Sequence, residues 1–159
     1  MNILQPFYQS VETAIQEIGI PIEQTRDPQR PGMWHIRKGT ANLTIEITFY
    51  QPSQRVVMAV WSIMMDIPKN NVERLSQLLL ELNTVMMGPS FAYNNGKVLL
   101  RSVRDGEGLD AQECKYIILQ MGHFADEYDE KLQQDFPHQR PIGFQVGSQQ
   151  SPESPESQK

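Results

Sequence analysis

Residues 42–50 alternate strictly between polar and apolar side chains, and this is the clearest pattern in the sequence. The apolar set is Leu43, Ile45, Ile47 and Phe49, and the polar set is Asn42, Thr44, Glu46, Thr48 and Tyr50. A two-residue period predicts a β-strand that is buried on one face. Residues 33–38, before a turn around Gly39, and residues 55–65, after a turn at residues 51–54, predict two further strands.

Apolar residues recur at helical spacing on both sides of this β region. The first helix is expected to run from Pro6, which fits a first helical turn, to a stop signal at Gly19. The last helix is expected to run from about Asp110, a capping residue, to Phe136. Gly122 lies inside it, where glycine costs about 1 kcal/mol relative to alanine, so we expect close packing or a slight bend there.

A helix and a hairpin are expected between these regions. Asn70 can cap the helix, with Glu73 three residues later as a capping-box partner. Asn94-Asn95-Gly96 then predicts a tight hairpin turn between strands at residues 90–93 and 97–104, because Asn and Gly tolerate positive φ angles.

The predicted order of elements is therefore α-βββ-α-ββ-α. Two junctions are tight turns that cannot provide the crossover connections of parallel strands, so we expect an α+β fold in which helices cover a largely antiparallel sheet. We expect residues 1–137 to form the folded domain. Residues 138–159 are expected to be a disordered Ser/Pro/Gln-rich tail, because residues 148–159 contain no apolar side chain.

Several packing motifs along the chain resemble those of the YbjN-type domain family, whose fold is akin to that of type III secretion chaperones. They are Leu82-Asn83, Phe91, Gly96-Lys97-Val98 with Leu100, Gly108-Leu109 and Ala125-Asp126-Glu127-Tyr128, and the similarity covers roughly residues 3–136. The resemblance implies a two-layer α/β sandwich, with a five-stranded antiparallel sheet and the helices packed on one face. It also implies a sensory-transduction regulator. The structurally similar secretion chaperones are homodimers that hold partner segments in extended form. No catalytic residues are described for the family, so none can be carried over.

Composition excludes several classes of function. The formal net charge is -5 and the basic residues are scattered, which argues against nucleic acid as a partner. Cys114 is the only cysteine, so no intrachain disulfide can form. The first six residues lack the features of a signal peptide, and no apolar stretch is long enough to span a bilayer. We expect a cytoplasmic protein with no membrane partner.

The residue types that usually carry chemistry are present but not in productive patterns. His35, His123 and His138 have no neighbours at the spacings of metal ligands. Cys114 falls on the apolar face of the last helix, where burial raises the thiol pKa and makes the side chain inert.

The acidic turn before the last helix suggests a calcium loop, but its spacing does not match an EF-hand. Asp105, Glu107 and Asp110 make up this turn, and Arg101 and Arg104 lie close enough in sequence to neutralise it. We therefore predict no metal site, no cofactor site and no catalytic residues, and expect the protein not to be an enzyme.

Both faces of the strand at residues 55–65 are apolar, unlike those of a solvated antiparallel strand. One set is Val56, Met58, Val60 and Met64, and the other is Val57, Ala59, Trp61, Ile63 and Met65. A turn of even length at residues 51–54 would pair Phe49 with Val56, which puts the first set under the helices and the second on the far face.

The far face is the candidate partner or dimer interface if no other part of the chain covers it. Its predicted residues are Thr48, Tyr50, Val57, Ala59, Trp61, Ile63 and Met65. Two alternatives stay open. The N-terminal loop or the segment before the tail could cover this face, and a turn of odd length would exchange the two sets.

We expect a homodimeric protein-binding module, a chaperone-like or regulatory adaptor that binds a protein segment through its sheet face or an edge strand. One alternative is a small-ligand sensory domain with a pocket between sheet and helices. Met58, Leu79, Leu82 and Met121 would line that pocket. A second alternative is an enzyme that uses His35, His123 or Glu46 in a cleft.

Overall fold

One antiparallel sheet of five strands forms the centre of the molecule, in a computed structural model that describes residues 3–137. Its spatial order is β1-β2-β3-β5-β4. The strands are β1 (Met33–Lys38), β2 (Ala41–Tyr50), β3 (Arg55–Asp66), β4 (Ser90–Asn94) and β5 (Lys97–Asp105). All of their pairings are antiparallel. The tight turns require this arrangement for β1 with β2, β2 with β3 and β4 with β5.

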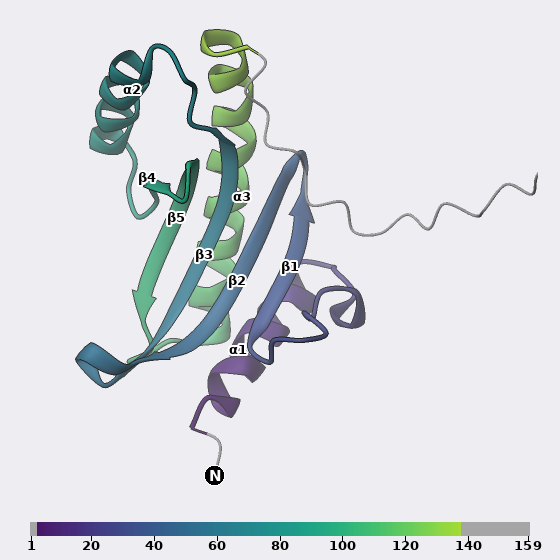
Figure 1. Cartoon of the computed structure of the whole chain (residues 1–159). Helices are drawn as coiled ribbons and strands as arrows, with labels where there is room; N and C mark the ends of the chain where they lie inside the picture. The colour runs from purple at the N-terminus through teal and green to yellow at the C-terminus, as the bar shows by residue number, and fades with distance from the viewer. Residues whose placement is uncertain (1–2, 138–159) are drawn as a thin grey trace, which may run out of the picture.

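The helices are α1 (Gln5–Glu17), α2 (Val72–Val85) and α3 (Ala111–Asp135). A short 3₁₀ turn, η1 (Ile22–Gln24), lies between α1 and β1, and a second, η2 (Gln51–Ser53), connects β2 to β3. Helix α3 runs across one face of the sheet with α1 beside it, and α2 lies at one end of the sheet next to β4 (Figure 1). The α+β class and the order α-βββ-α-ββ-α are therefore confirmed. The prediction of a disordered tail at residues 138–159 lies outside the described residues.

The core lies between the sheet and α3. The predicted register is confirmed, because Phe49 pairs with Val56 and Ile47 with Met58. The buried side chains that meet in this layer include Leu43, Ile45 and Ile47 of β2, Met58 and Val60 of β3, Val98 and Leu100 of β5, and Cys114, Ile118 and Met121 of α3. The even turn thus directs the first apolar set of β3 toward the helices.

Helix α3 packs closely on the turn between β1 and β2. A Cβ atom at Gly122 would lie 2.7 Å from Cγ of Lys38, so the predicted close packing is confirmed. One turn later, the carboxylate of Asp126 accepts hydrogen bonds from the backbone N–H of Thr40, at 2.9 Å, and from its hydroxyl group. These bonds lower the pKa of Asp126.

Local capping signals were correct for α3 and wrong for α2. Asp110 caps α3 and accepts a hydrogen bond from the N–H of Glu113 at 2.8 Å. Helix α2 begins one residue later than expected, with Asn71 at the cap position and no side-chain capping bond. Asn71 has a φ angle of 63°, and this left-handed backbone differs from the extended conformation in which a cap side chain reaches the first turn.

None of the helices within residues 3–137 is long and apolar enough to cross a lipid bilayer.

Candidate binding face of the sheet

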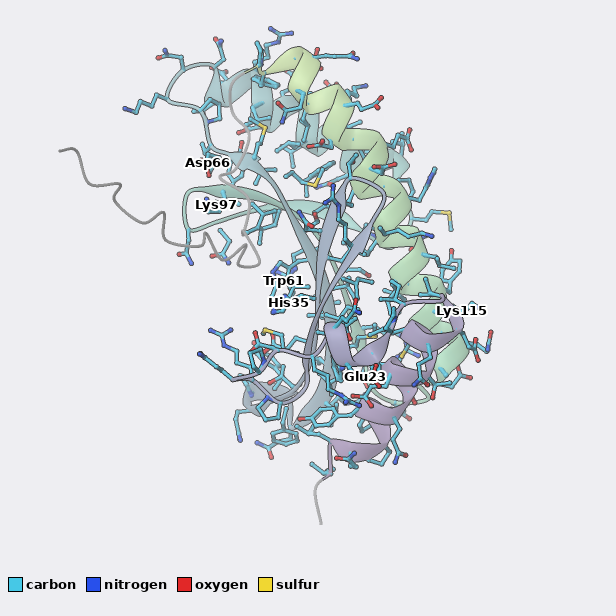
Figure 2. All side chains as sticks on the ribbon, turned by 90° about the vertical axis from the view of Figure 1, so that its right-hand side faces the viewer. Glu23, His35, Trp61, Asp66, Lys97 and Lys115 are labelled. Atoms are coloured by element: carbon cyan, nitrogen blue, oxygen red, sulfur yellow. The ribbon has the colours of Figure 1, made fainter. Side chains whose placement is uncertain are left out.

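The face of the sheet opposite α3 carries no helix within residues 3–137. Trp61 and His35 project from this side, whereas Lys115 belongs to the helical layer (Figure 2). In the register of the sheet, Trp61 lies between Thr44 of β2 and Arg101 of β5. Trp61 is thus near the middle of the helix-free face.

Apolar side chains form a continuous stripe on this face, along the two neighbouring strands β3 and β5. We call it the outer-face stripe, and it consists of Val57, Ala59, Trp61, Ile63, Leu99 and Val103. Ile63 is 43% exposed and Val103 is 49% exposed, which is high for large apolar side chains. Polar residues of β2, Thr44, Glu46 and Thr48, border the stripe on one side.

Six of the seven residues predicted for this face lie on it. They are Thr48, Tyr50, Val57, Ala59, Trp61 and Ile63. The placement of Met65 is wrong, because the pairing of β3 with β5 shifts between Ile63 and Met65. This β-bulge inserts one extra residue and turns Met65 toward the core, where it pairs with Val98 and is 1% exposed. That the six residues bind a partner stays a prediction.

The contribution of β5 was missed by the reasoning from sequence. Leu99 and Val103 have the two-residue spacing of one strand face, with Arg101 between them. This spacing was available in the sequence, but it becomes informative only when β5 is known to pair with β3. Their positions widen the apolar surface from one strand to two.

Some backbone groups of the two edge strands, β1 and β4, already form hydrogen bonds with other parts of the chain. On β1, the N–H of His35 donates to the carbonyl oxygen of Thr25 at 2.7 Å, and the N–H of Asp27 donates to that of Met33 at 2.9 Å. On β4, the amide side chain of Asn83 accepts from the N–H of Phe91 at 2.7 Å and donates to its carbonyl oxygen at 3.2 Å. An added strand would have to displace these bonds. The face is therefore more accessible to a partner than the edges.

The hydrogen bonds of the Asn83 side chain to β4 should contribute measurably to the stability of the protein. We expect Asn83→Leu to lower the free energy of unfolding by about 1–3 kcal/mol, because it leaves two partly buried backbone groups of Phe91 without partners. Urea denaturation followed by circular dichroism measures this change. The matched variant Gln77→Leu, on the exposed side of the same helix, should change stability by less than about 0.5 kcal/mol. Equal losses in the two variants would show that Asn83 does not hold the edge.

His35 takes part in a structural network. Its Nε2 atom lies 2.9 Å from Oδ2 of Asp27, and its Nδ1 atom lies 3.2 Å from Oγ1 of Thr44. The pKa of Asp27 is lowered, first by the hydrogen bond with His35 and then by the backbone N–H groups of Gln29 and Arg30. Asp27 therefore links the loop before β1 to the outer face.

The residues considered for catalysis do not converge. His35 and Glu46 belong to the outer face, whereas His123 lies on the solvent side of α3 and contacts Glu127 at 3.5 Å. Cys114 is fully buried, and burial raises the pKa of its thiol to about 12. The prediction that burial raises this pKa is confirmed, and such a thiol is a poor nucleophile.

The acidic turn is paired with arginines. Arg55 contacts Asp105 at 2.9 Å and Glu107 at 3.1 Å, while Arg104 contacts Glu113 at 2.7 Å. The pKa of Asp105 is lowered, mainly by the N–H of Glu107 and also by Arg55. Within residues 3–137, no group of three or more His, Cys, Asp and Glu side chains is arranged to hold a metal ion.

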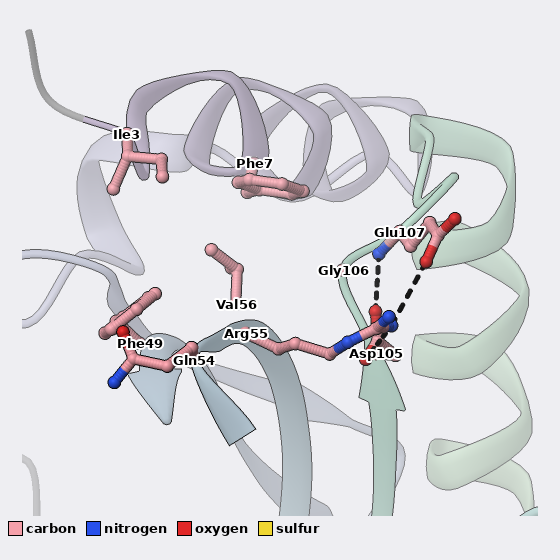
Figure 3. A pocket seen from close by; sticks show the side chains of 9 residues that line it. All are labelled: Ile3, Phe7, Phe49, Gln54, Arg55, Val56, Asp105, Gly106 and Glu107. Carbon is pink, nitrogen blue, oxygen red and sulfur yellow. Dashed lines mark hydrogen bonds and ion pairs between the residues drawn. The ribbon is translucent and has the colours of Figure 1, made fainter. Parts of the chain in front are cut away.

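A small open pocket of about 260 Å³ lies between the start of α1 and the hairpin of β2 and β3. Phe7, Phe49 and Val56 give it an apolar lining, and the ion pairs of Arg55 form one wall (Figure 3). Its volume is below the usual range of about 300–1,000 Å³ for small-molecule sites. The pocket expected between sheet and helices would be lined by Met58, Leu79, Leu82 and Met121, and these four side chains are 0–8% exposed within the packed core.

The fold of this chain is similar to that of chains in several solved protein complexes. A chain in the ExsC–ExsE complex matches with a TM-score of 0.58 and 13% identity, covering 82% of this chain and 96% of that one. A chain in the HopA1–SchA chaperone–effector complex matches with a TM-score of 0.58 and 15% identity, covering 82% and 98%. A chain in the ExoU–SpcU complex of the Pseudomonas aeruginosa type III secretion system has a TM-score of 0.53 and 11% identity, covering 76% and 93%.

The sequence itself identifies the family. The family model YbjN, described as "Putative bacterial sensory transduction regulator", matches residues 8–134, so the chain belongs to the YbjN family. No curated protein matches the sequence significantly.

Proposed function

We propose that this chain is a non-enzymatic protein-binding module, a chaperone-like or regulatory adaptor. Its outer-face stripe would bind an extended segment of a partner protein or a second copy of the chain. The observation that carries the proposal is the stripe itself, six apolar side chains on adjacent strands of a face without a helix. Large exposed apolar patches with a polar border are typical of protein interfaces.

The position of Trp61 supports this proposal. The indole is half-buried at the middle of the stripe, between polar neighbours on β2 and β5. Tryptophan is enriched among the residues that contribute most to binding energy, and these residues cluster near the centre of an interface. The fold similarity to proteins solved in chaperone–effector complexes agrees with this role.

The alternative of a small-ligand sensor has less support. Its expected lining residues fill the core, and the open pocket beside Phe7 is small. Binding through an edge strand also has less support, because Thr25, Asp27 and Asn83 already bond to the backbones of the two edges.

Trp61→Lys is expected to abolish partner capture by placing a charge at the middle of the apolar stripe. The measurement is affinity capture from native lysate with quantitative mass spectrometry, using the intact chain and the variant. Tyr116→Lys is the matched control, because Tyr116 is 63% exposed on α3, on the other side of the sheet. A partner should be lost with Trp61→Lys, retained with Tyr116→Lys and recovered in part with Trp61→Phe.

Light scattering of the same three variants tests the proposed homodimer. A dimer that dissociates only with Trp61→Lys would mean that a second copy occupies the stripe. If Trp61→Lys captured the same proteins as the intact chain and also kept its mass in solution, the proposed surface would be wrong.

A further inference from the structure

Two side chains of opposite charge flank the outer-face stripe. Arg101 of β5 lies beside Trp61 in the register of the sheet, and Glu46 of β2 lies beside Ala59. The cation is thus on one side of β3 and the anion on the other. Within the part of the chain that the structure describes, neither side chain forms an ion pair.

Other ionic groups on the same face are matched within the chain. Arg55 is held by the acidic turn, and Lys97 contacts Asp66 at 2.6 Å (Figure 2). Arg37, near the end of β1, donates to the carbonyl oxygen of Gly39 at 3.3 Å. The two charges that flank the stripe are therefore the ones available to a partner.

The positions of these two charges are self-complementary. Arg101 and Glu46 lie two strands and one cross-strand row apart, so their Cα atoms are separated by about 12 Å. The midpoint between them lies over β3, between Ala59 and Trp61, near the middle of the outer-face stripe. A two-fold axis between two stacked sheets can pass over this midpoint and exchange the two positions. It then places Arg101 of each chain opposite the partner's Glu46, as in an isologous interface.

We infer that a second copy of this chain occupies the outer-face stripe, in a symmetric dimer that pairs Arg101 with the partner's Glu46 twice. The apolar side chains of the two stripes would be buried against each other between these ion pairs. Opposite charges at the border of an apolar patch fix the relative orientation of two chains and disfavour other partners. The inference rests on the proposed function, because it takes the stripe as the binding surface, and it names the occupant.

Sedimentation equilibrium of the full chain tests the pairing by charge reversal. Arg101→Glu and Glu46→Arg each turn both intermolecular pairs into like-charge pairs, so we expect either variant to raise the dimer dissociation constant at least about tenfold. Lys131→Glu is the matched control, because it makes the same change of charge at an exposed position on α3. Its dissociation constant should stay within about twofold of that of the intact chain, since distant surface charges are screened by salt.

An equimolar mixture of the two charge-reversed variants provides the sharper measurement. In a heterodimer of Arg101→Glu with Glu46→Arg, both pairs again join opposite charges. We therefore expect the mixture to associate with about the affinity of the intact chain, which is measured with one variant labelled by a fluorophore. Recovery of association in the mixture also shows that both variants are folded.

Three outcomes would overturn this inference. The first is an intact chain that stays monomeric at the highest concentration attainable, and loss of capture with Trp61→Lys would then still support the proposed function. The second is a dimer that neither charge reversal weakens, or a mixture that associates no better than each variant alone. The third is a dimer that Trp61→Lys leaves intact, because its contact would lie outside the stripe.

Discussion

Met65→Lys is expected to destabilise the protein by more than about 3 kcal/mol, the largest effect anticipated for a single substitution on β3. The Met65 side chain is 1% exposed and pairs with Val98 in the core layer, so an ammonium group there would be desolvated without a partner. Denaturation in urea, followed by circular dichroism, measures the loss, and a chain that no longer folds would fulfil the same expectation.

Ile63→Lys provides the matched control for this prediction. Ile63 lies two residues earlier on the same strand but is 43% exposed on the outer face, so the charge remains in water. We expect its cost to be below about 1 kcal/mol. If Met65→Lys lowered the free energy of unfolding as little as Ile63→Lys does, the bulge would not turn Met65 inward. Met65 would then lie on the outer face, as simple alternation along β3 predicts.

Leu100→Ala is expected to lower the free energy of unfolding by about 2–5 kcal/mol, the range for removal of a buried leucine side chain. Leu100 is fully buried at the middle of β5, where it pairs with Ser62 of β3 and Phe91 of β4. The surrounding strands are fixed by pairing on both sides, so the site cannot collapse around the cavity. Thermal and urea denaturation measure the change.

Leu99→Ala makes the same chemical change one residue earlier, on the opposite face. Its side chain is only partly buried, so we expect a cost below about 1 kcal/mol. Because Leu99 belongs to the outer-face stripe, this variant should nevertheless weaken partner capture. A loss of stability equal to that of Leu100→Ala would mean that the outer face is covered. Unchanged capture would remove Leu99 from the binding surface.

Several features of the fold could be predicted because they depend on neighbours in sequence. The alternation from Leu43 to Phe49 fixes which side of β2 is buried, since successive side chains point to opposite faces. The Asn95-Gly96 turn adopts the positive φ angles of 48° and 75° that these residues tolerate. Asp110 caps α3 through a bond within its own first turn.

The candidate site was predictable to a smaller extent. Trp61 and Ile63 were placed on the outer face, because the even turn sets the register of β3 against β2. The β-bulge could not be predicted. Met64 and Met65 are both apolar and both buried, so the sequence carries no change of polarity to mark the extra residue. The bulge is defined only by the pairing of β3 with β5, which is more than thirty residues away in sequence.

By itself the sequence determined the class of fold, the order of its elements and the apolar character of both faces of β3, because each follows from local periodicity and turn chemistry. Only the tertiary structure decided the remaining features: the stripe shared by β3 and β5, the inward turn of Met65, the bonds of Asn83 to the β4 edge and the pairing of Arg55 with the acidic turn. Each of these joins groups that are distant in sequence. Their contact depends on how the strands and helices pack together, and a local pattern carries no information about that packing.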